Sequence, residues 1–361
     1  MGKAISMRAV STVVALGASV LVATCGGGGG GPTVALLLPE SKTARYESQD
    51  RPHFTTRLKQ ACPRCRLIYS NADQDASKQQ QQAEAALTQG AKVLVLDPVD
   101  AASASVIVQR AKQQKVPVIS YDRLITNADI DYYVSFDNLR VGRLQAQTLV
   151  KKLRSSGRAS GAITMINGAP TDNNAKLFKQ GALSVLKTSG FNVAKQYDTP
   201  DWSPDQAQNE MQQAITALGN NGFVGVYAAN DGTAGGAIAA MKAAGIDPAT
   251  RPTTGQDAEL DAIQRILAGQ QYMTVYKAVK PEAAAAAQIA AALAQSRPAP
   301  TGVINQRSNN GKRAVPSVIL TPVAVTKSNV KDTVIRDGFW KASQVCTGSF
   351  ASACRSAGIS G

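Results

Sequence analysis

Residues 93–123 read VLVLDPVDAASASVIVQRAKQQKVPVISYDR, and this stretch decides the fold class. Two β-rich runs, Val93–Asp97 and Val116–Arg123, enclose a helix-like segment at 103–115. A strand, a helix and a second strand in this order are typical of a right-handed βαβ unit, in which the two strands lie parallel. The stretch therefore predicts an α/β fold built on a parallel sheet.

The same alternation extends in both directions along the chain. Before residue 93, the β-rich runs Val34–Leu38 and Arg66–Ala72 are followed by helix-like segments near 46–60 and 76–89. After the run Tyr132–Asn138 a second set begins, with strands expected at Ala162–Asn167, Val193–Asp198, Phe223–Asn230, Thr253–Asp257 and Met273–Lys277. Two such sets predict two doubly wound lobes.

Three helices of the second set have recognisable ends. Ser203-Pro204-Asp205-Gln206 combines an N-cap serine, a proline at the first helical position and a glutamine at the third. The segment Asn173–Ser189 carries an apolar face at helical spacing and is followed by Gly190. Asp231, which Gly232 and Thr233 follow, is expected to cap a further helix.

Length and composition are those of a globular two-domain protein. The chain has 361 residues, of which 44% are hydrophobic and 18% charged. Its formal net charge of +14 raises the question of a nucleic-acid or membrane partner. The basic residues are scattered, however, in runs no longer than a pair. Because nucleic-acid binders cluster their charge, we interpret the surplus as a solvated basic surface and expect no nucleic-acid partner.

The N-terminus has the layout of a secretory signal. Lys3 and Arg8 precede an apolar stretch at 9–23 that is too short to cross a bilayer. Residues 21–25, LVATC, resemble a bacterial lipobox, in which the cysteine, here Cys25, is acylated. The six glycines at 26–31 would form a flexible tether. We therefore expect an exported protein that a lipid anchor holds at a membrane surface.

Four cysteines remain after Cys25, and export makes disulfides plausible. Cys62-Pro63-Arg64-Cys65 has the spacing of a redox motif or of half a zinc site, but we favour a local bridge in a loop between a helix and a strand. Cys346 and Cys354 would close a second loop near the C-terminus. Four cysteines permit three pairings, and all three stay open at this point.

The sequence lacks the residues that several kinds of catalytic and binding chemistry need. The chain has one histidine, His53, which excludes nearly every His-dependent zinc site and nearly every Ser-His or Cys-His catalytic arrangement. His53 itself is expected on the surface of a first helix or in its packing. No phosphate-binding loop of the form GxxxxGK[ST] occurs. The glycine run formally matches the GxGxxG motif, but it precedes the first strand instead of following it, so this motif does not apply either. We expect no cofactor, no bound metal and no enzyme.

Polar residues gather where β-rich runs stop. In open α/β sheets, ligands bind at the carboxyl ends of the strands. For any single residue a helix-capping role is the better interpretation, but the accumulation predicts a binding site together with Arg45, Arg123 and Lys277. The residues at strand ends are Asp97, Asp122, Arg123, Asp137, Asn138, Asn230, Asp231 and Asp257.

A series of short stretches carries a resemblance that covers nearly the whole mature length. They are Tyr121–Arg123, Asn127–Asp131, Ser135–Asn138, Asp172–Phe178, Asn230–Ile238, Gly255–Ala258, Met273–Lys277 and Lys331–Phe339. In this order they resemble a known family, the bacterial periplasmic sugar-binding proteins of the D-xylose-binding type.

The resemblance implies two Rossmann-like lobes joined by three hinge crossovers, with a sugar in the cleft between them. The crossovers are expected near Asn138–Gly142, Lys277–Lys280 and Leu320–Val323. Tyr46 stands where relatives often have a tryptophan beside the arginine, and Trp202 is expected as a stacking platform. The resemblance implies these sugar-binding residues: Arg45, Tyr46, Asp122, Arg123, Asp172, Asn174, Trp202, Asn230, Asp257 and Lys277.

The resemblance also implies a division of the chain. Residues 1–24 would be the signal peptide, 25–32 the acylated cysteine with its tether, and 346–361 a cysteine-containing tail. The N-terminal lobe would comprise 33–138 with 278–320, and the C-terminal lobe 139–277 with 321–345.

The function that follows is delivery of a monosaccharide to an ABC permease and its ATPase by a monomeric binding protein. D-Xylose is the first choice; glucose, galactose and arabinose are alternatives. A sugar sensor that presents its closed form to a receptor is a second class. A sugar-responsive repressor would need a DNA-binding helix-turn-helix where this chain has a signal, and an enzyme would need a nucleophile–base pair that does not stand out.

Overall fold

The computed structural model describes residues 1–5 and 30–359. The predicted signal segment and Cys25 lie outside the described residues. The chain divides into two units, Met1–Gly30 and Gly31–Gly361. In the first unit, the described residues have no regular secondary structure and are exposed. Among the described residues, no helix combines the length and apolar character needed to cross a membrane.

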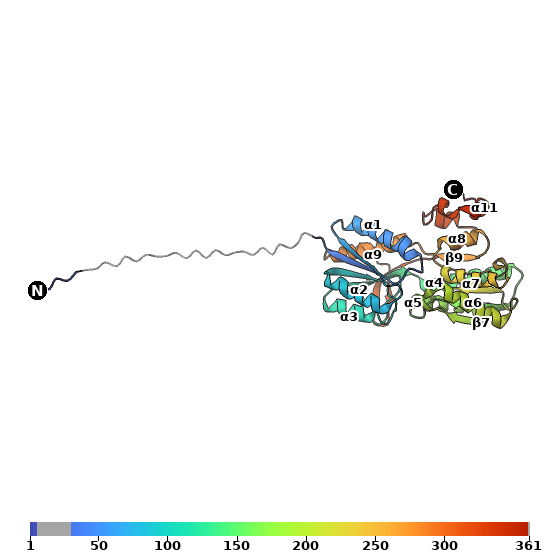
Figure 1. The fold of residues 1–361 in the computed structure, drawn as a ribbon, viewed down its shortest axis with the longest axis horizontal. Coiled ribbons are helices and arrows are strands. Elements are labelled where there is room, and N and C mark those ends of the chain that lie inside the picture. Colours follow the sequence, from blue (N-terminus) through green and yellow to red (C-terminus); the bar gives the residue numbers. More distant parts are fainter. Residues whose placement is uncertain (6–29, 360–361) are drawn as a thin grey trace. The chain divides into compact units, whose positions relative to one another are not determined.

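The N-terminal lobe is built on a seven-stranded sheet. Its strand order is β10-β11-β5-β4-β3-β1-β2, and all neighbours are parallel except β10 and β11. Helices α1 and α9 cover one face, and α2 and α3 the other (Figure 1). The bounds are β1 Thr33–Leu38, β2 Arg66–Asn71, β3 Ala91–Leu96, β4 Val118–Tyr121, β5 Tyr132–Phe136, β10 Gln306–Asn309, β11 Ala314–Leu320, α1 Arg51–Ala61, α2 Ala76–Thr88, α3 Ser105–Gln113 and α9 Val279–Ala294.

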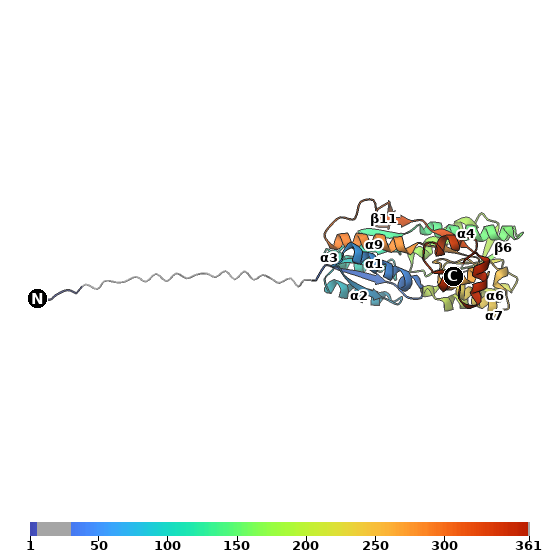
Figure 2. The ribbon, with the colours of Figure 1, turned by 90° about the horizontal axis from the view of Figure 1, so that it is seen from above.

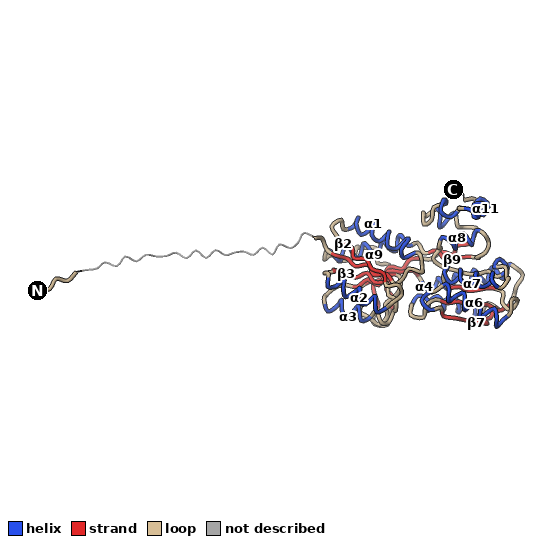
Figure 3. Tube along the Cα trace, viewed as in Figure 1, coloured by secondary structure: helices blue, strands red, loops and turns tan. Residues whose placement is uncertain are grey.

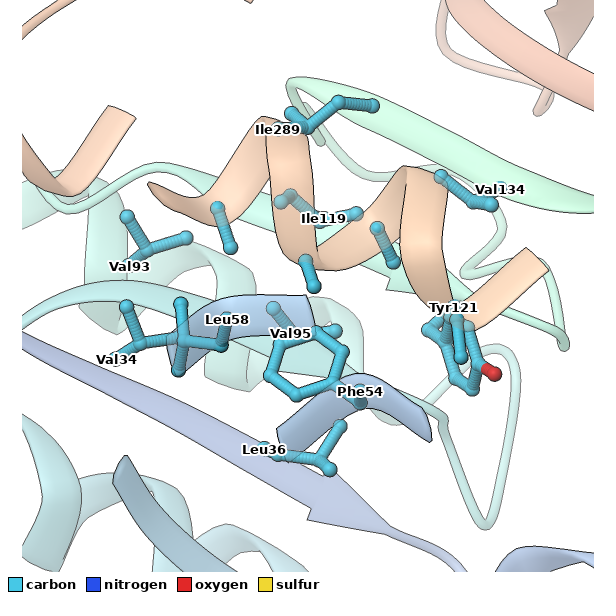
Figure 4. Close-up of a cluster of buried hydrophobic side chains, with 14 of the residues drawn as sticks. Val34, Leu36, Phe54, Leu58, Val93, Val95, Ile119, Tyr121, Val134 and Ile289 are labelled. Atoms are coloured by element: carbon cyan, nitrogen blue, oxygen red, sulfur yellow. The ribbon is translucent and has the colours of Figure 1, made fainter. Parts of the chain in front are cut away.

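Strand β1 lies between β3 and the edge strand β2 and is buried on both faces. Because successive side chains of a strand point to opposite faces, Val34, Leu36 and Leu38 pack beneath α1 and α9 (Figure 4), whereas Ala35 and Leu37 pack beneath α2 and α3. This explains why the sequence there is continuously apolar. The short alanines of α9 allow that helix to lie close to the sheet, beside α1 (Figures 1 and 2).

The C-terminal lobe repeats this plan with a smaller sheet. Strands β7, β6 and β8 pair in parallel in that order, and β9 pairs antiparallel with β12. The α4 and α5 side chains belong to one core cluster and those of α6 and α7 to another, as expected for helices on opposite faces. The bounds are β6 Gly161–Asn167, β7 Phe191–Asp198, β8 Gly225–Ala228, β9 Met273–Tyr276, β12 Val323–Thr326, α4 Asn138–Ser155, α5 Asn173–Leu186, α6 Pro204–Leu218, α7 Asp231–Ala243 and α8 Leu260–Leu267.

The predicted strand at Thr253–Asp257 is wrong as a regular strand. The segment lies between β8 and β9 and bonds to both, through Thr254 N to Val226 O at 3.1 Å and Val275 N to Gly255 O at 3.0 Å. Regular pairing stops because the Thr254 hydroxyl accepts the hydrogen bond of the Ala228 N–H. Asp257 then turns the chain with φ +94°.

Two further expectations at helix starts are corrected. Asn230, not Asp231, caps α7: its side chain accepts from Thr233 N at 2.8 Å, and Asp231 is the first helical residue. The helix expected at 46–60 begins instead with a wider π-turn at Tyr46–Asp50, followed by α1. The cap at Ser203 is confirmed, with Pro204 at the first position of α6.

The chain passes between the two lobes three times, from β5 to α4, from β9 to α9 and from β11 to β12 (Figure 3). The predicted fold class, two doubly wound lobes with three crossovers, is therefore confirmed. Disulfides join Cys62 to Cys65, in the loop between α1 and β2, and Cys346 to Cys354. The second bridge lies in the C-terminal segment 331–359, which packs against α8 and carries α10 Ala342–Val345 and α11 Ala351–Ser356.

Helices α4 and α5 cross in close contact at two glycines. A Cβ at Gly142 would lie 1.9 Å from the Phe178 carbonyl oxygen, and one at Gly181 would lie 2.2 Å from the Leu139 carbonyl oxygen. Both obstacles are backbone atoms, which a rotamer change cannot move. Because the two helices pack this closely, the first turns of α5 lie beside the start of α4, where the chain enters from β5.

We predict that Gly142→Ala lowers the free energy of unfolding by about 1–3 kcal/mol, because the added methyl group forces the two helices apart. Urea unfolding measures the change. The control is Gly235→Ala on α7, where the nearest atom, at the end of the Arg265 side chain, lies 3.4 Å from the added Cβ. A Gly142→Ala variant as stable as the Gly235→Ala variant would contradict the prediction.

Candidate functional site

The carboxyl ends of strands from both lobes meet around one small cavity. Asp122 and Arg123 follow β4, Asn230 follows β8, and Lys277 follows β9. Asp172 and Asn174 lie at the start of α5, after β6. The cavity is lined by Thr43, Tyr46, Asp122, Arg123, Asp172, Asn174, Phe178, Trp202, Asn230, Gln256, Asp257 and Lys277. Nine of the ten predicted sugar-binding residues are in this set, and Arg45 lies directly behind it.

Asp122 is the centre of the polar contacts. Its carboxylate accepts from the Tyr46 hydroxyl at 3.0 Å, from Lys277 Nζ at 3.3 Å and from Arg45 Nη1 at 3.4 Å. Burial opposes ionisation of this group, but the charges of Arg45 and Lys277 hold the pKa of Asp122 well below its usual range. Asp122 is therefore a permanent carboxylate, able to accept hydrogen bonds from a ligand.

Arg123 connects the two lobes. Its Nε lies 3.1 Å from Asp172 Oδ2 of the C-terminal lobe, and its Nη2 lies 3.4 Å from Glu40 Oε1 of the N-terminal lobe. Asp97, at 3.7 Å, is a third carboxyl neighbour. All four side chains are buried. The guanidinium is thus a rigid donor at the boundary between the lobes.

Arg45 is held from behind by two carboxyl groups. Its Nη2 lies 2.6 Å from both Asp50 Oδ1 and Glu282 Oε2, and its Nε donates to Asp50 Oδ2 at 2.8 Å. The remaining Nη1 points toward the cavity, 3.4 Å from Asp122 and 3.7 Å from Asp257. The bidentate pair with Asp50 fixes the plane of the guanidinium. Asp50 in turn accepts from the Tyr121 hydroxyl.

Aromatic rings form part of the wall. The Trp202 indole donates from Nε1 to Asp172 Oδ2 at 3.1 Å and meets Phe178 edge to face, with ring centroids 6.4 Å apart. A Cβ at position 168 would lie 2.0 Å from the indole, so Gly168 is what leaves room for Trp202. On the other side, the Tyr46 ring lies between the guanidinium groups of Arg45 and Arg123, at 5.5 and 5.6 Å.

Asparagine amides complete the contact between the lobes. Asn174 donates to the Asp122 carbonyl at 3.1 Å and accepts from the Asn138 amide at 2.8 Å. Asn230 lines the cavity and also caps α7. His53, outside the site, lies on α1 with its Nε2 3.2 Å from Gln49 Oε1, as expected of a packing role.

Comparisons with known proteins agree with this architecture. A family described as "Periplasmic binding protein domain" matches residues 34–298. The chain is 41% identical to the D-xylose-binding periplasmic protein of Escherichia coli K12, over 78% of this chain and 83% of that protein. It is 34% identical to the multiple sugar-binding periplasmic receptor ChvE of Rhizobium radiobacter, over 87% of this chain and 92% of that protein.

The chain belongs to the periplasmic sugar-binding protein family.

Solved structures support the same assignment. A carbohydrate-transporter solute-binding protein from Chloroflexus aurantiacus, in complex with D-glucose, aligns with a TM-score of 0.77 and 32% identity over 86% of this chain and 97% of its own. A solute-binding protein from Clostridium phytofermentans with bound β-D-glucose aligns with a TM-score of 0.78 and 28% identity, over 87% of this chain and 99% of its own. Family membership confirms the expectation that the protein is a binder and no enzyme.

Sequence reasoning missed some of the residues around this cavity. Thr43, Phe178 and Gln256 line the cavity, and Gln256 is 98% buried with no hydrogen-bond partner for its Oε1 among the described residues. Gln256 stands directly before Asp257, a position that could have drawn attention to it. Asp50 and Glu282 gave no signal, because each lies inside a helical segment and reaches the site only through Arg45.

The site buries more carboxyl groups than cations. The three cations are Arg45, Arg123 and Lys277, and the carboxyl groups are Glu40, Asp50, Asp97, Asp122, Asp172, Asp257 and Glu282. Such an excess cannot stay fully ionised away from water. Burial accordingly raises the pKa of Asp97, Asp172 and Glu282, although Arg123 or Arg45 acts in the opposite direction on each. The folded protein therefore keeps the protons of these groups to higher pH than the unfolded chain does.

This proton content predicts how stability depends on pH. Burial raises the pKa of Glu282 in the folded protein. At pH values above about 4.3, the ordinary pKa of a glutamate, the folded state therefore binds more protons than the unfolded state. The free energy of unfolding then falls as pH rises. Glutamine resembles the protonated acid and does not titrate. We predict that Glu282→Gln becomes increasingly more stable than the wild type from pH 5 to pH 8, as urea unfolding at several pH values would measure.

The matched control is Glu84→Gln on the exposed face of α2. It should leave the pH dependence of the wild type unchanged. A Glu282→Gln variant whose stability follows the wild type in parallel at every pH would show that Glu282 is ionised in the folded protein.

Proposed function

We propose that this protein binds a monosaccharide, with D-xylose as first choice, in the cavity between its lobes and delivers it to an ABC permease and its ATPase. The observation that carries the proposal is the cavity itself, in which charged donors and acceptors from both lobes surround a space flanked by aromatic rings. The names of the relatives from Escherichia coli and Rhizobium radiobacter support a sugar ligand.

The chemistry of the cavity suits a neutral sugar ring. Each hydroxyl of a pyranose can donate and accept one or more hydrogen bonds. Asp122 and Asp257 would accept from hydroxyls, Arg45, Arg123 and Lys277 would donate, and the amides of Asn174 and Asn230 can do either. Bonds to ionised partners are stronger than neutral ones in a closed, dry cleft. Trp202 would cover an apolar face of the ring.

The identity of the sugar within this class is also a proposal. Relatives named for D-xylose support a pentose, whereas the two solved structures hold D-glucose and the Rhizobium radiobacter receptor is named for multiple sugars. Glucose, galactose and arabinose are therefore the alternatives. We expect the shape of the cavity near Tyr46 and Trp202 to select among them, because both side chains line the cavity.

The two lobes would close around the sugar. Contacts that cross the cleft, such as Arg123 with Asp172 and Lys277 with Asp122, join side chains that separate when the lobes open. A sugar that bonds to both lobes would favour closure because it contacts both only when they meet. We assign 33–138 with 278–320 to the N-terminal lobe and 139–277 with 321–345 to the C-terminal lobe, in a monomer. A sensor that signals its closed form to a receptor is the second candidate.

The proposal is tested by calorimetric titration of the mature protein with D-xylose, D-glucose, D-galactose and L-arabinose. Arg123→Ala and Asp257→Ala should each weaken binding by about 2–4 kcal/mol, on the order of 30-fold or more, because the partner groups stay buried and unpaired. Lys179→Ala, which removes the exposed ion pair with Asp198, is the control and should bind like the wild type.

Two results would contradict the proposal. If none of the four sugars binds, the ligand class is wrong. If both alanine variants titrate like the wild type while a sugar does bind, the binding site is assigned to the wrong residues.

We further propose that the protein is exported and anchored to the outer face of the cytoplasmic membrane through Cys25. The support is the sequence alone: a signal-like segment, the lipobox-like residues 21–25 and a glycine tether, with Thr24 in place of the usual small residue before the cysteine. The expectation is that Cys25→Ser moves the protein from the membrane fraction to the soluble fraction. Unchanged membrane association would contradict acylation at Cys25.

A further inference from the structure

The turn that carries Asp257 has an unfavourable backbone. Asp257 and Ala258 have φ values of +94° and +53°, and neither is a glycine. Residues other than glycine rarely adopt this left-handed region, and they persist there only when surrounding contacts hold them. Two consecutive residues of this kind, one of them lining the cavity, point to contacts that fix the direction of the Asp257 carboxylate.

Part of the support comes from strand β9. The Asp257 N–H donates to Val275 O at 2.9 Å, and the Ala258 N–H donates to the Thr274 hydroxyl at 3.2 Å. That hydroxyl donates to Asp231 Oδ2 at 2.8 Å, which also accepts from Glu259 N at 3.0 Å. These bonds hold the N–H side of the turn.

The carbonyl side is held by the C-terminal segment. The Trp340 indole donates from Nε1 to the Ala258 carbonyl at 2.8 Å. Trp340 does not line the cavity, and it reaches the site only through this bond. Its position is set by Phe339, whose ring meets both Trp340, at 5.5 Å, and Tyr276, at 5.2 Å.

The C-terminal segment is itself firmly packed. Val345, Cys354 and Ile359 are buried in the same apolar cluster as Ala258 and Phe339, and the Cys346–Cys354 disulfide closes the segment. The second cysteine pair, which has no role in sugar contact, thus lies in the element that supports the indole.

We propose that Trp340 is a positioning residue of the binding site: its indole N–H fixes the Ala258 carbonyl and thereby aims the Asp257 carboxylate at the ligand. The inference rests on the proposed function, because the carboxylate that Trp340 positions, that of Asp257, is proposed there to contact the sugar. In this arrangement Asp257 lies 3.4 Å from Lys277 Nζ and 3.7 Å from Arg45 Nη1. Within the C-terminal segment it is thus the Trp340 indole that contributes to recognition, and the packing of the segment against α8 is a separate, structural role.

The test is Trp340→Phe, which keeps an aromatic ring and removes the N–H. We expect sugar affinity in calorimetric titration to fall about 3- to 10-fold, the effect of one hydrogen bond. The control is Val345→Ala, which weakens packing in the same cluster but removes no hydrogen bond to the turn. It should lower the melting temperature but leave affinity unchanged. An unchanged affinity in Trp340→Phe would overturn the proposal.

A double-mutant cycle separates positioning from a general structural effect. In the Asp257→Ala background, Trp340→Phe should weaken binding no further, because the group it positions is gone. An equal loss in both backgrounds would mean that the indole acts on the whole lobe.

A third measurement needs no variant. The chain has two tryptophans, so its amide spectrum contains two indole N–H signals. Coupling between the ligand and the turn is reciprocal. Saturating sugar should therefore slow hydrogen exchange at the Trp340 indole, although Trp340 does not line the cavity. An unaffected Trp340 signal would overturn the proposal.

A failure of the proposed function would look different from a failure of this inference. If no sugar binds, the ligand class is wrong, and the positioning role is then judged from backbone amide exchange at residues 257–259. These amides should exchange faster in Trp340→Phe than in Val345→Ala. Equal exchange rates in the two variants would overturn the role of Trp340 independently of any sugar.

Discussion

Asp122 is a nearly completely buried carboxylate that contacts Tyr46, Arg45 and Lys277 at once. Removing such a charge from water is costly, and the cost is offset only if its partners are held in fixed positions. Arg45 is fixed by Asp50 and Glu282 on helical segments, whereas Lys277 comes from the other lobe at a crossover. One ionised side chain therefore connects helical segments of one lobe with a crossover to the other.

The same constraint bears on which ligands suit the cavity. Ion pairs such as Arg123 with Asp172 join the lobes, and the buried carboxyl groups outnumber the cations beside them. Neutral hydroxyls are suited to this setting because they satisfy both carboxylates and cations without adding charge. An ionic ligand would instead upset the balance of charge.

Residues outside the cavity hold the groups around it. Trp340 donates to the Ala258 carbonyl beside Asp257, and Glu282 on α9 accepts from Arg45. Both supporting residues belong to segments that follow a crossover, so the chain supports the polar groups of each lobe with a segment that returns to that lobe later in the sequence.

Strand–helix alternation determined the α/β class and the two lobes, and a short motif determined the cap at Ser203, because these are local signals. Polar residues at strand ends, together with the resemblance to the sugar-binding family, supplied nine of the residues around the cavity. Sequence reasoning failed at Thr253–Asp257, where a threonine hydroxyl replaces a backbone partner, and at Asp231, whose carboxylate bonds to Thr274 and Gln271 instead of capping a helix. Only the tertiary structure placed Gln256, Glu282 and Trp340, since their roles depend on which buried groups they meet, and such long-range contacts leave no periodicity in the chain.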